Sequence, residues 1–187
     1  MRIIGGIYRG KPLITPEGNA IRPTSERARE AVFTRLMHSF GNPSPLIGGT
    51  ILDLCCGTGA MGLEAMSRGA AHTTFIDITN KSIAIAKKNA AALGVENQCS
   101  FITTDARKLP DANTAVDIIF CDPPYDAGME HNILSQLHTH GWLEENTLLI
   151  MEMALKNDWA EELSETQWDV DIRKYGKTKV AFIEAAN

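Results

Sequence analysis

The chain has 187 residues, of which 44% are hydrophobic and 22% are charged. This length suits one domain, which we expect to span residues 1–187. No apolar run approaches the roughly 20 residues that a membrane-spanning helix needs, and the N-terminus lacks a secretory signal pattern. We therefore expect a soluble, cytoplasmic protein. Its four cysteines show no C-x-x-C spacing, which favours a reduced interior over a metal site.

The formal net charge of −5 is distributed unevenly along the chain. Residues 1–38 hold seven basic and three acidic groups, which gives +4 for this part and leaves −9 for the remainder. A basic arm on an acidic body is compatible with local attraction to phosphate groups. A solvated helix face accounts for the same residues equally well, so charge alone leaves both interpretations open.

The first predicted elements are a hairpin and a helix. Short extended runs within residues 2–15, separated by glycine and basic residues, predict a small N-terminal hairpin extension within residues 1–20. Thr24 and Ser25 then follow Pro23 as suitable N-cap residues. Apolar side chains repeat at helical spacing from there to Leu36, which predicts a helix.

From residue 50 onward, apolar strands alternate with helical patterns. The strands are expected at residues 50–54, 72–77, 99–103, 115–121 and 147–153, and the helices at 58–68, 79–93 and about 128–139. This alternation predicts an α/β, doubly wound fold with a mostly parallel sheet and right-handed crossovers. Two final strand-like runs, residues 167–174 and 178–184, are too close for a crossover helix and should form an antiparallel hairpin.

The loop after the first predicted strand contains Gly57, Gly59 and Gly62 in G-x-G-x-x-G spacing. In a doubly wound sheet this loop usually holds the ligand, because glycines let the backbone approach closely and a helix N-terminus follows. The spacing alone also suits a nicotinamide dinucleotide. Asp53 favours a different ligand, because its carboxylate would repel a pyrophosphate but could accept hydrogen bonds from an ammonium group. S-adenosylmethionine carries that ammonium and no phosphate.

Two further acids follow predicted strands. Asp77 ends the second strand and is suited to a ribose diol, which NAD would satisfy equally well. Asp105 follows the third strand and could accept a hydrogen bond from an adenine amino group. Taken singly, Asp53 could cap a turn and Asp105 could be solvated. Three acids at successive strand ends together favour S-adenosylmethionine as the cofactor.

After the fourth predicted strand comes Asp122-Pro123-Pro124-Tyr125. Consecutive prolines hold the chain extended and leave carbonyl oxygens available as acceptors. The Asp122 carboxylate and the Pro123 carbonyl could each accept one N–H of an exocyclic base amine, while Tyr125 stacks on the base. The amine would then face the sulfonium methyl, and transfer would need no metal and no covalent enzyme intermediate. A proline-bearing surface loop is the alternative for this tetrapeptide alone.

The motifs D-L-C-C-G-T-G, F-I-D, T-D-A and D-P-P-Y resemble those of S-adenosylmethionine-dependent amino methyltransferases. The segments G-G-I-Y-R-G-K-P-L, R-P-T-S-E-R-A-R-E-A-V-F and R-K-Y-G-K-T resemble the RsmD-type methyltransferases of bacterial small-subunit ribosomal RNA. The resemblance implies a Rossmann-like class I methyltransferase fold with a seven-stranded, mostly parallel sheet. It also implies that the substrate is the exocyclic N2 amine of a guanine in 16S rRNA, within the 30S subunit or its assembly intermediate. We expect a monomer.

The resemblance assigns roles to individual residues. The target-amine clamp would be Asp122, Pro123, Pro124 and Tyr125. The cofactor residues would be Asp53, Gly57, Gly59, Asp77, Asp105 and Ala106. Basic residues of the N-terminal part, which simple solvation would explain equally well, could meet RNA: Arg2, Arg9, Lys11 and Arg22.

Two other activities stay open. Adenine-N6 methyltransferases share D-P-P-Y, so a DNA or RNA adenine is an alternative target, although 187 residues leave little room for a separate base-reading domain. An NAD-dependent oxidoreductase would satisfy the glycine spacing and Asp77, but Asp53 and the double proline argue against it.

Overall fold

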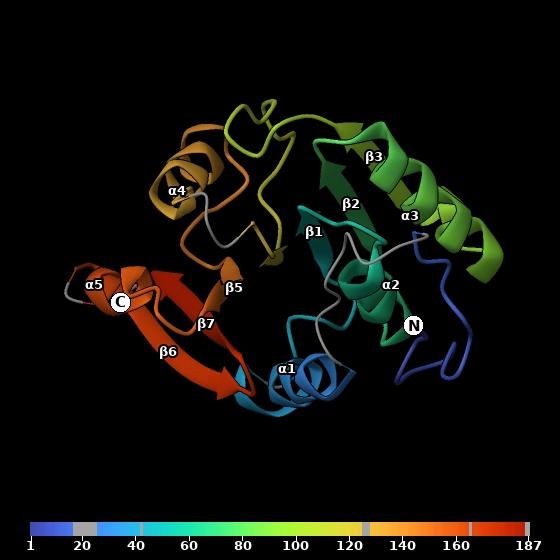
Figure 1. Cartoon of the computed structure of the whole chain (residues 1–187), viewed down its shortest axis with the longest axis horizontal. Helices are drawn as coiled ribbons and strands as arrows, with labels where there is room; N and C mark the ends of the chain where they lie inside the picture. The colour runs from blue at the N-terminus through green and yellow to red at the C-terminus, as the bar shows by residue number, and fades with distance from the viewer. Residues whose placement is uncertain (17–25, 42, 125–127, 165, 186–187) are drawn as a thin grey trace.

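The computed structural model describes residues 1–16, 26–41, 43–124, 128–164 and 166–185. A seven-stranded sheet with the order β3-β2-β1-β4-β5-β7-β6 forms its centre (Figure 1). The parallel strands are β1 (Thr50–Leu54), β2 (His72–Asp77), β3 (Cys99–Thr103), β4 (Ile118–Cys121) and β5 (Leu148–Ala154). β7 (Thr178–Ala185) runs antiparallel to both β5 and β6 (Trp168–Tyr175). The predicted mostly parallel sheet with a C-terminal antiparallel hairpin is therefore confirmed.

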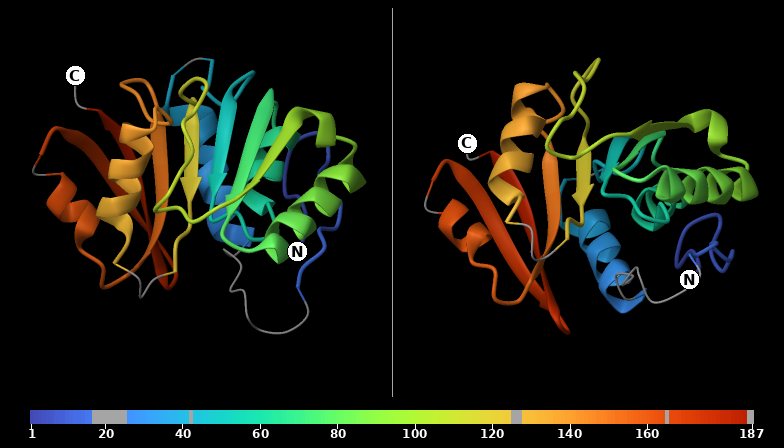
Figure 2. Two further views of the ribbon diagram at one scale, coloured as in Figure 1. Left: turned by 90° about the horizontal axis from the view of Figure 1, so that it is seen from above. Right: turned by 45° about the horizontal axis from the view of Figure 1, so that its top comes forward.

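Helices cover both faces of the sheet, and each face has its own hydrophobic core. The helices are α1 (Glu26–Ser39), α2 (Ala60–Ser67), α3 (Asn80–Leu93), α4 (Glu130–Thr139) and α5 (Trp159–Leu163), with a 3-10 turn at Glu96–Gln98. Buried residues of α1, α2 and α3 share one core with the N-terminal residues Ile3 and Leu13, whereas α4 and α5 contribute to the other. Figure 2 shows α1 and α4 on opposite sides of the sheet. No described helix is long and apolar enough to cross a bilayer.

Several boundaries differ from the sequence prediction by one to three residues, and two of these differences have clear local reasons. The second helix begins at Ala60 rather than 58, because Gly59 has a left-handed φ of 76° that still belongs to the loop. The fourth strand begins at Ile118 rather than 115, because the Val116 N–H donates to the Trp142 carbonyl instead of to a neighbouring strand. Helix α5 was not predicted, since its five residues are too few for a periodic pattern.

The N-terminal segment, residues 1–16, folds back on itself and packs against the main body. The Ile3 N–H donates to the Lys11 carbonyl at 2.9 Å, and Arg2 and Pro12 form an antiparallel bridge, as expected for the hairpin extension. Asn89 of α3 holds the end of this segment: its Oδ1 accepts from the Ile14 N–H at 2.7 Å, and its Nδ2 donates to the Ile14 carbonyl at 3.1 Å. The same Nδ2 donates to the Thr58 carbonyl at 3.0 Å, so the segment lies beside the glycine loop.

Candidate active site

A cleft of about 590 Å³ lies where the parallel strands β1, β2 and β4 end. Strand order reverses between β1 and β4, and this is the position at which doubly wound sheets bind ligands. Its lining brings together most of the residues predicted for cofactor and substrate: Asp53, Gly57, Asp77, Asp105, Ala106, Asp122, Pro123 and Pro124. The predicted cofactor acids and the predicted amine clamp therefore share one cleft. Tyr125 lies outside the described residues.

The glycine loop after β1 is tightly folded. Cys55, a residue with a Cβ, has a φ of 61°, and Gly57 has a φ of 54°. Gly59 does not line the cleft; it turns the chain into α2, and its N–H donates to the Cys56 carbonyl at 2.7 Å. Gly62 lets α2 lie against β2, because a Cβ there would come within 2.5 Å of the Phe75 ring. The three glycines therefore shape the loop, although only the first lines the cleft.

Asp53 braces this loop from inside the protein. Its side chain is buried, and its Oδ2 accepts a hydrogen bond from the Gly62 N–H at 2.9 Å. Burial raises the pKa of Asp53 to about 7, and the charge of Asp77 acts in the same direction, while the Gly62 hydrogen bond opposes them. A carboxylate can accept about four hydrogen bonds, so Asp53 can brace the loop and still accept one from a ligand ammonium in the cleft.

Asp77 is held in place by backbone donors on both sides. Its Oδ2 accepts from the Gly57 N–H at 3.0 Å, and its Oδ1 accepts from the Thr79 N–H at 2.9 Å. Thr79 in turn caps α3, because its Oγ1 accepts from the Ser82 N–H at 3.1 Å. Asp77 therefore connects the glycine loop to the start of α3, and its carboxylate has a fixed orientation at the edge of the cleft.

Asp105 is paired with Arg107, a residue that the sequence prediction missed. The Arg107 Nη2 lies 2.6 Å from Asp105 Oδ2, and the Arg107 Nε lies 3.0 Å from Oδ1. The hydrogen bonds from Arg107 lower the pKa of Asp105 to about 2. Both residues line the cleft, so Asp105 faces any ligand as a carboxylate already engaged by a guanidinium. The D-x-R spacing in the sequence was the available signal.

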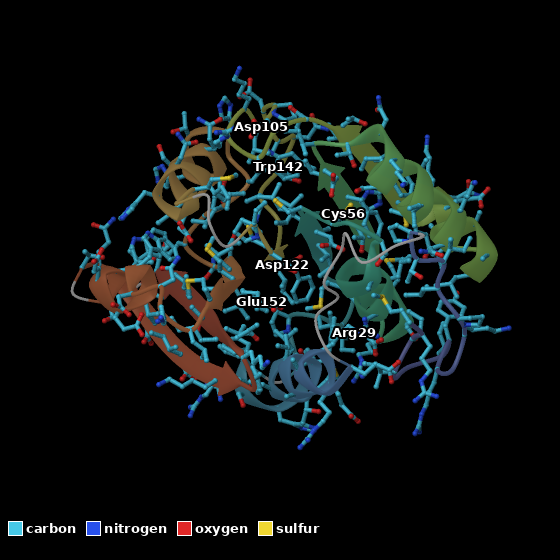
Figure 3. The ribbon with its side chains drawn as sticks, viewed as in Figure 1. Arg29, Cys56, Asp105, Asp122, Trp142 and Glu152 are labelled. Atoms are coloured by element: carbon cyan, nitrogen blue, oxygen red, sulfur yellow. The ribbon has the colours of Figure 1, made fainter. Side chains whose placement is uncertain are left out.

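Asp122 lies on the same face of the sheet as Asp53. β1 and β4 pair Asp53 with Phe120, and β4 and β5 pair Phe120 with Ile150. Side chains two residues apart share a face, so Asp122 and Glu152 follow on that side, and Figure 3 shows them next to each other. Both also line a small cavity of about 30 Å³ together with Asp53. Burial, followed by the charges of Glu152 and Asp53, raises the pKa of Asp122 to about 8.

Two residues from the N-terminal part of the chain complete the cleft, and sequence reasoning missed both. Met1 lines it, and its Sδ accepts a hydrogen bond from Thr58 Oγ1 at 3.5 Å. Arg29 of α1 lines it as well and is 1% exposed. A signal for Arg29 existed, since it lies three residues before Val32 and seven before Leu36, on the buried stripe of α1.

Three of the four predicted RNA-binding residues, Arg2, Arg9 and Lys11, do not line the cleft. Arg9 and Lys11 are exposed on the N-terminal segment. The Arg2 Nη2 lies 3.2 Å from Glu26 Oε2, and the Arg2 side chain is 63% exposed. Arg22 lies outside the described residues. Within the described part of the chain, no group of three or more His, Cys, Asp or Glu side chains is arranged to hold a metal ion.

Comparison with known proteins identifies the family. The model of the family described as Conserved hypothetical protein 95 matches residues 1–184. The chain is 33% identical over 157 residues to "Ribosomal RNA small subunit methyltransferase D" of Escherichia coli (strain K12), covering 84% of this chain and 76% of the relative. A protein of the same name from Haemophilus influenzae is 31% identical over 156 residues, which cover 81% of this chain and 78% of the relative.

A solved structure agrees with these sequence relatives. The structure of "Putative methyltransferase yhhF from Escherichia coli" has a TM-score of 0.81 and 28% identity, covering 100% of this chain and 98% of that chain. The family resemblance seen in the sequence motifs is confirmed. The chain belongs to the family described as Conserved hypothetical protein 95, the family of the RsmD-type methyltransferases.

Proposed function

We propose that this protein transfers a methyl group from S-adenosylmethionine to the exocyclic N2 amine of a guanine in 16S rRNA of the small ribosomal subunit. The observation that carries the proposal is the cleft in which Asp53 and Asp77 lie with Asp122 and Pro123. The names of the relatives support small-subunit rRNA as the substrate class. The substrate is the 30S subunit or an assembly intermediate, and the enzyme acts as a cytoplasmic monomer.

The residues of the cleft fit S-adenosylmethionine better than a dinucleotide. Asp53 and Asp77 give the glycine-loop side of the cleft two acids that would repel a pyrophosphate, while the charge of the third acid, Asp105, is already paired with Arg107. The same acids can accept hydrogen bonds from the ammonium, ribose and adenine amino groups of S-adenosylmethionine. Ile76 and Ala106 add buried apolar surface for the adenine ring. When bound, this cofactor supplies a methyl group on a positively charged sulfonium.

Asp122 and Pro123 orient the target amine. The Asp122 carboxylate and the Pro123 carbonyl each accept one N–H, which directs the nitrogen lone pair toward the methyl group. The new N–C bond forms as the S–C bond breaks, and the bonding electron pair stays on sulfur. The methylated amine then loses one proton. The positive sulfonium favours the ionised form of Asp122, and a carboxylate whose pKa is about 8 in the empty cleft is a good acceptor for that proton once the sulfonium charge is gone.

Family membership, and not the Asp122–Tyr125 segment, favours guanine N2 over adenine N6 as the target. The D-P-P-Y tetrapeptide can present either amine, so the clamp alone does not discriminate. The family model matches residues 1–184 and so includes the basic N-terminal segment, and the named relatives act on small-subunit rRNA. Adenine-N6 methylation is therefore the second candidate.

The test is incubation of the protein with methyl-labelled S-adenosylmethionine and 30S particles from a strain that lacks the modification. Digestion to nucleosides and mass spectrometry should identify N2-methylguanosine. N6-methyladenosine would replace this proposal with the second candidate, and label on DNA alone would exclude rRNA as the substrate. The Asp122→Ala variant serves as the control that binds cofactor without transferring the methyl group.

A further inference from the structure

Arg29 occupies an unusual position for an arginine. It lies on α1, where Figure 3 labels it. Its side chain lines the cleft and is 1% exposed. Its Nη2 donates to the Arg2 carbonyl at 2.6 Å. Its Nε is buried without a hydrogen-bond partner and lies 3.8 Å from Glu64 Oε2. A buried cation is normally paired with an anion at hydrogen-bond distance, and this guanidinium has only the longer contact.

Glu64 is already engaged by other donors. Its Oε2 accepts from the Ile4 N–H at 2.7 Å, and its Oε1 accepts from the Gly5 N–H at 2.7 Å. The Arg68 Nη2 lies 2.8 Å from the same Oε1. One buried carboxylate therefore faces two guanidinium groups, those of Arg29 and Arg68, so these three side chains carry a net charge of +1. Arg29 is the member of the three that lines the cleft.

The neighbouring loop presents further donors for an anion. Thr58, Ala60 and Met61 line the cleft at the start of the eight-residue helix α2. Within the described part of the chain, their backbone N–H groups have no hydrogen-bond partner. The N-terminal end of a helix favours negative charge. The start of α2 and Arg29 thus line the same cleft, and both favour an anionic group in it.

We propose that Arg29, together with the N–H groups at the start of α2, binds the α-carboxylate of the amino-acid part of S-adenosylmethionine. The inference rests on the proposed function and extends it to a residue for which no role was predicted. Asp53 and Arg29 line the same cleft, so the α-ammonium and the α-carboxylate of the cofactor each have a partner of opposite charge. The guanidinium also gains the hydrogen-bonding anion that Glu64 does not provide.

An RNA phosphate is the other anion that could meet Arg29. Burial argues against it, because the Arg29 side chain is 1% exposed, its Nη2 donates to the Arg2 carbonyl and its Nε lies 3.8 Å from Glu64 Oε2. The cleft that Arg29 lines is also lined by the glycine loop, to which the cofactor is assigned. A phosphate of a large RNA substrate would approach from outside.

The experiment compares two ligands that differ only in the carboxylate. S-adenosylhomocysteine has it, whereas its decarboxylated analogue keeps the adenosine, the thioether and the amine. Titration calorimetry with the full chain measures the dissociation constant of each ligand. Wild type should bind S-adenosylhomocysteine about 10- to 100-fold more tightly than the decarboxylated analogue, which is the contribution expected from hydrogen bonds to a charged group. Arg29→Met should reduce this preference to less than about 3-fold, and Arg29→Lys should keep part of it because it keeps the charge.

The preference within one variant does not depend on how much of the protein is folded, so a destabilised variant still gives a valid ratio. Arg27→Met, which changes an exposed arginine of the same helix, should behave as wild type. The inference is wrong if Arg29→Met weakens both ligands equally, or if wild type does not distinguish them. It is also wrong if Arg29→Met lowers 30S affinity while the ligand preference persists, since the anion would then be RNA phosphate. Failure of wild type to bind either ligand would instead contradict the proposed function itself.

Discussion

The two halves of the cleft hold their carboxylates in different ways. In the cofactor half, the part of the cleft around Asp77 and Asp105, Asp77 accepts hydrogen bonds from two backbone N–H groups. Asp105 is paired with Arg107, and this pairing lowers the pKa of Asp105 to about 2. In the target half, Asp122 is buried beside Glu152 and Asp53, and its pKa is raised to about 8. Asp77 and Asp105 are therefore held in place before any ligand binds, whereas the charge of Asp122, like that of Asp53 with its pKa of about 7, depends on what enters the cleft.

This difference suits the two tasks of the site. Rigid, ionised acceptors bind a cofactor without reorganisation. A carboxylate with a raised pKa is stabilised in its charged form when a positive group arrives, and it takes up a proton readily once that positive charge is gone. Methyl transfer removes the positive charge from the sulfonium, so Asp122 is suited to receive the proton released at that step.

The largest expected effect is at Asp122. Asp122→Ala should lower the rate of methyl transfer to 30S particles by about 10²- to 10⁴-fold, the range for removing a positioned acceptor and base. Affinity for S-adenosylhomocysteine should change little, because the cofactor half is untouched. Single-turnover transfer and calorimetry measure the two quantities, with the exposed Asp111→Ala as a matched control. An equal loss of both would show that the halves are not separable.

The next effect is at Asp77. Asp77→Ala should weaken S-adenosylhomocysteine binding by about 1–3 kcal/mol, since it leaves ribose hydroxyls and the Gly57 N–H without an acceptor. Thr79→Ala is the matched control, because it removes the α3 cap and one hydroxyl hydrogen bond to Asp77 Oδ1 but leaves the carboxylate in the cleft. Unchanged binding in Asp77→Ala would remove this residue from the ribose site. An equal loss in Thr79→Ala would mean that Asp77 acts only through the helix.

A smaller effect concerns pH and stability. The pKa of Asp122 rises from 3.8 to about 8 on folding, so its contribution to stability is present at low pH and is lost as pH rises from about 4 to 8. Asp122→Asn cannot ionise and should gain stability relative to wild type, on the order of 3 kcal/mol, between pH 5.5 and 8.5. Urea unfolding without cofactor measures this. Glu152 and Asp53 face Asp122 in both proteins, so a pH-independent difference would contradict the raised pKa.

The smallest expected effect concerns RNA binding by basic residues that do not line the cleft. The double variant Arg9→Ala/Lys11→Ala should weaken 30S binding by about 3- to 10-fold and reduce the slope of log affinity against log salt by about 2. Cofactor affinity should stay at the wild-type value. Lys81→Ala/Lys156→Ala, at two exposed positions elsewhere, makes the same charge change and is the control. Equal losses in both pairs would indicate a general charge effect rather than an RNA contact.

The sequence predicted the sheet well because its strands are short apolar runs bounded by glycine and acidic residues. The first three strands begin and end at the predicted residues. The acids could be found because each follows a strand directly, and parallel strands bring their ends to one edge. Tyr125 and Arg22 lie outside the described residues, and all the site residues stay predictions until variants are tested.

The contacts that could not be predicted from the sequence are those between segments far apart in the chain. Arg29 lies near Glu64, which is 35 positions later in the chain, and Asp122 lies beside Glu152, 30 positions later. Hydrophobic periodicity along the sequence cannot reveal such pairs, because strand order and helix placement in the fold decide which distant residues come into contact. Arg107 is closer in sequence to its partner Asp105, but its pairing depends on the geometry of a loop without regular structure.

The hydrogen bonds that Asn89 forms with Ile14 and Thr58 affect the order in which the protein folds. Ile14 meets its partner 75 positions later in the chain, so the earliest residues made during translation wait until α3 has been synthesised. Contacts of such long sequence separation form slowly, because the intervening loop must close first. In refolding experiments, the Ile14 amide should therefore be among the last to gain protection from hydrogen exchange, after the amides of β1 and β2.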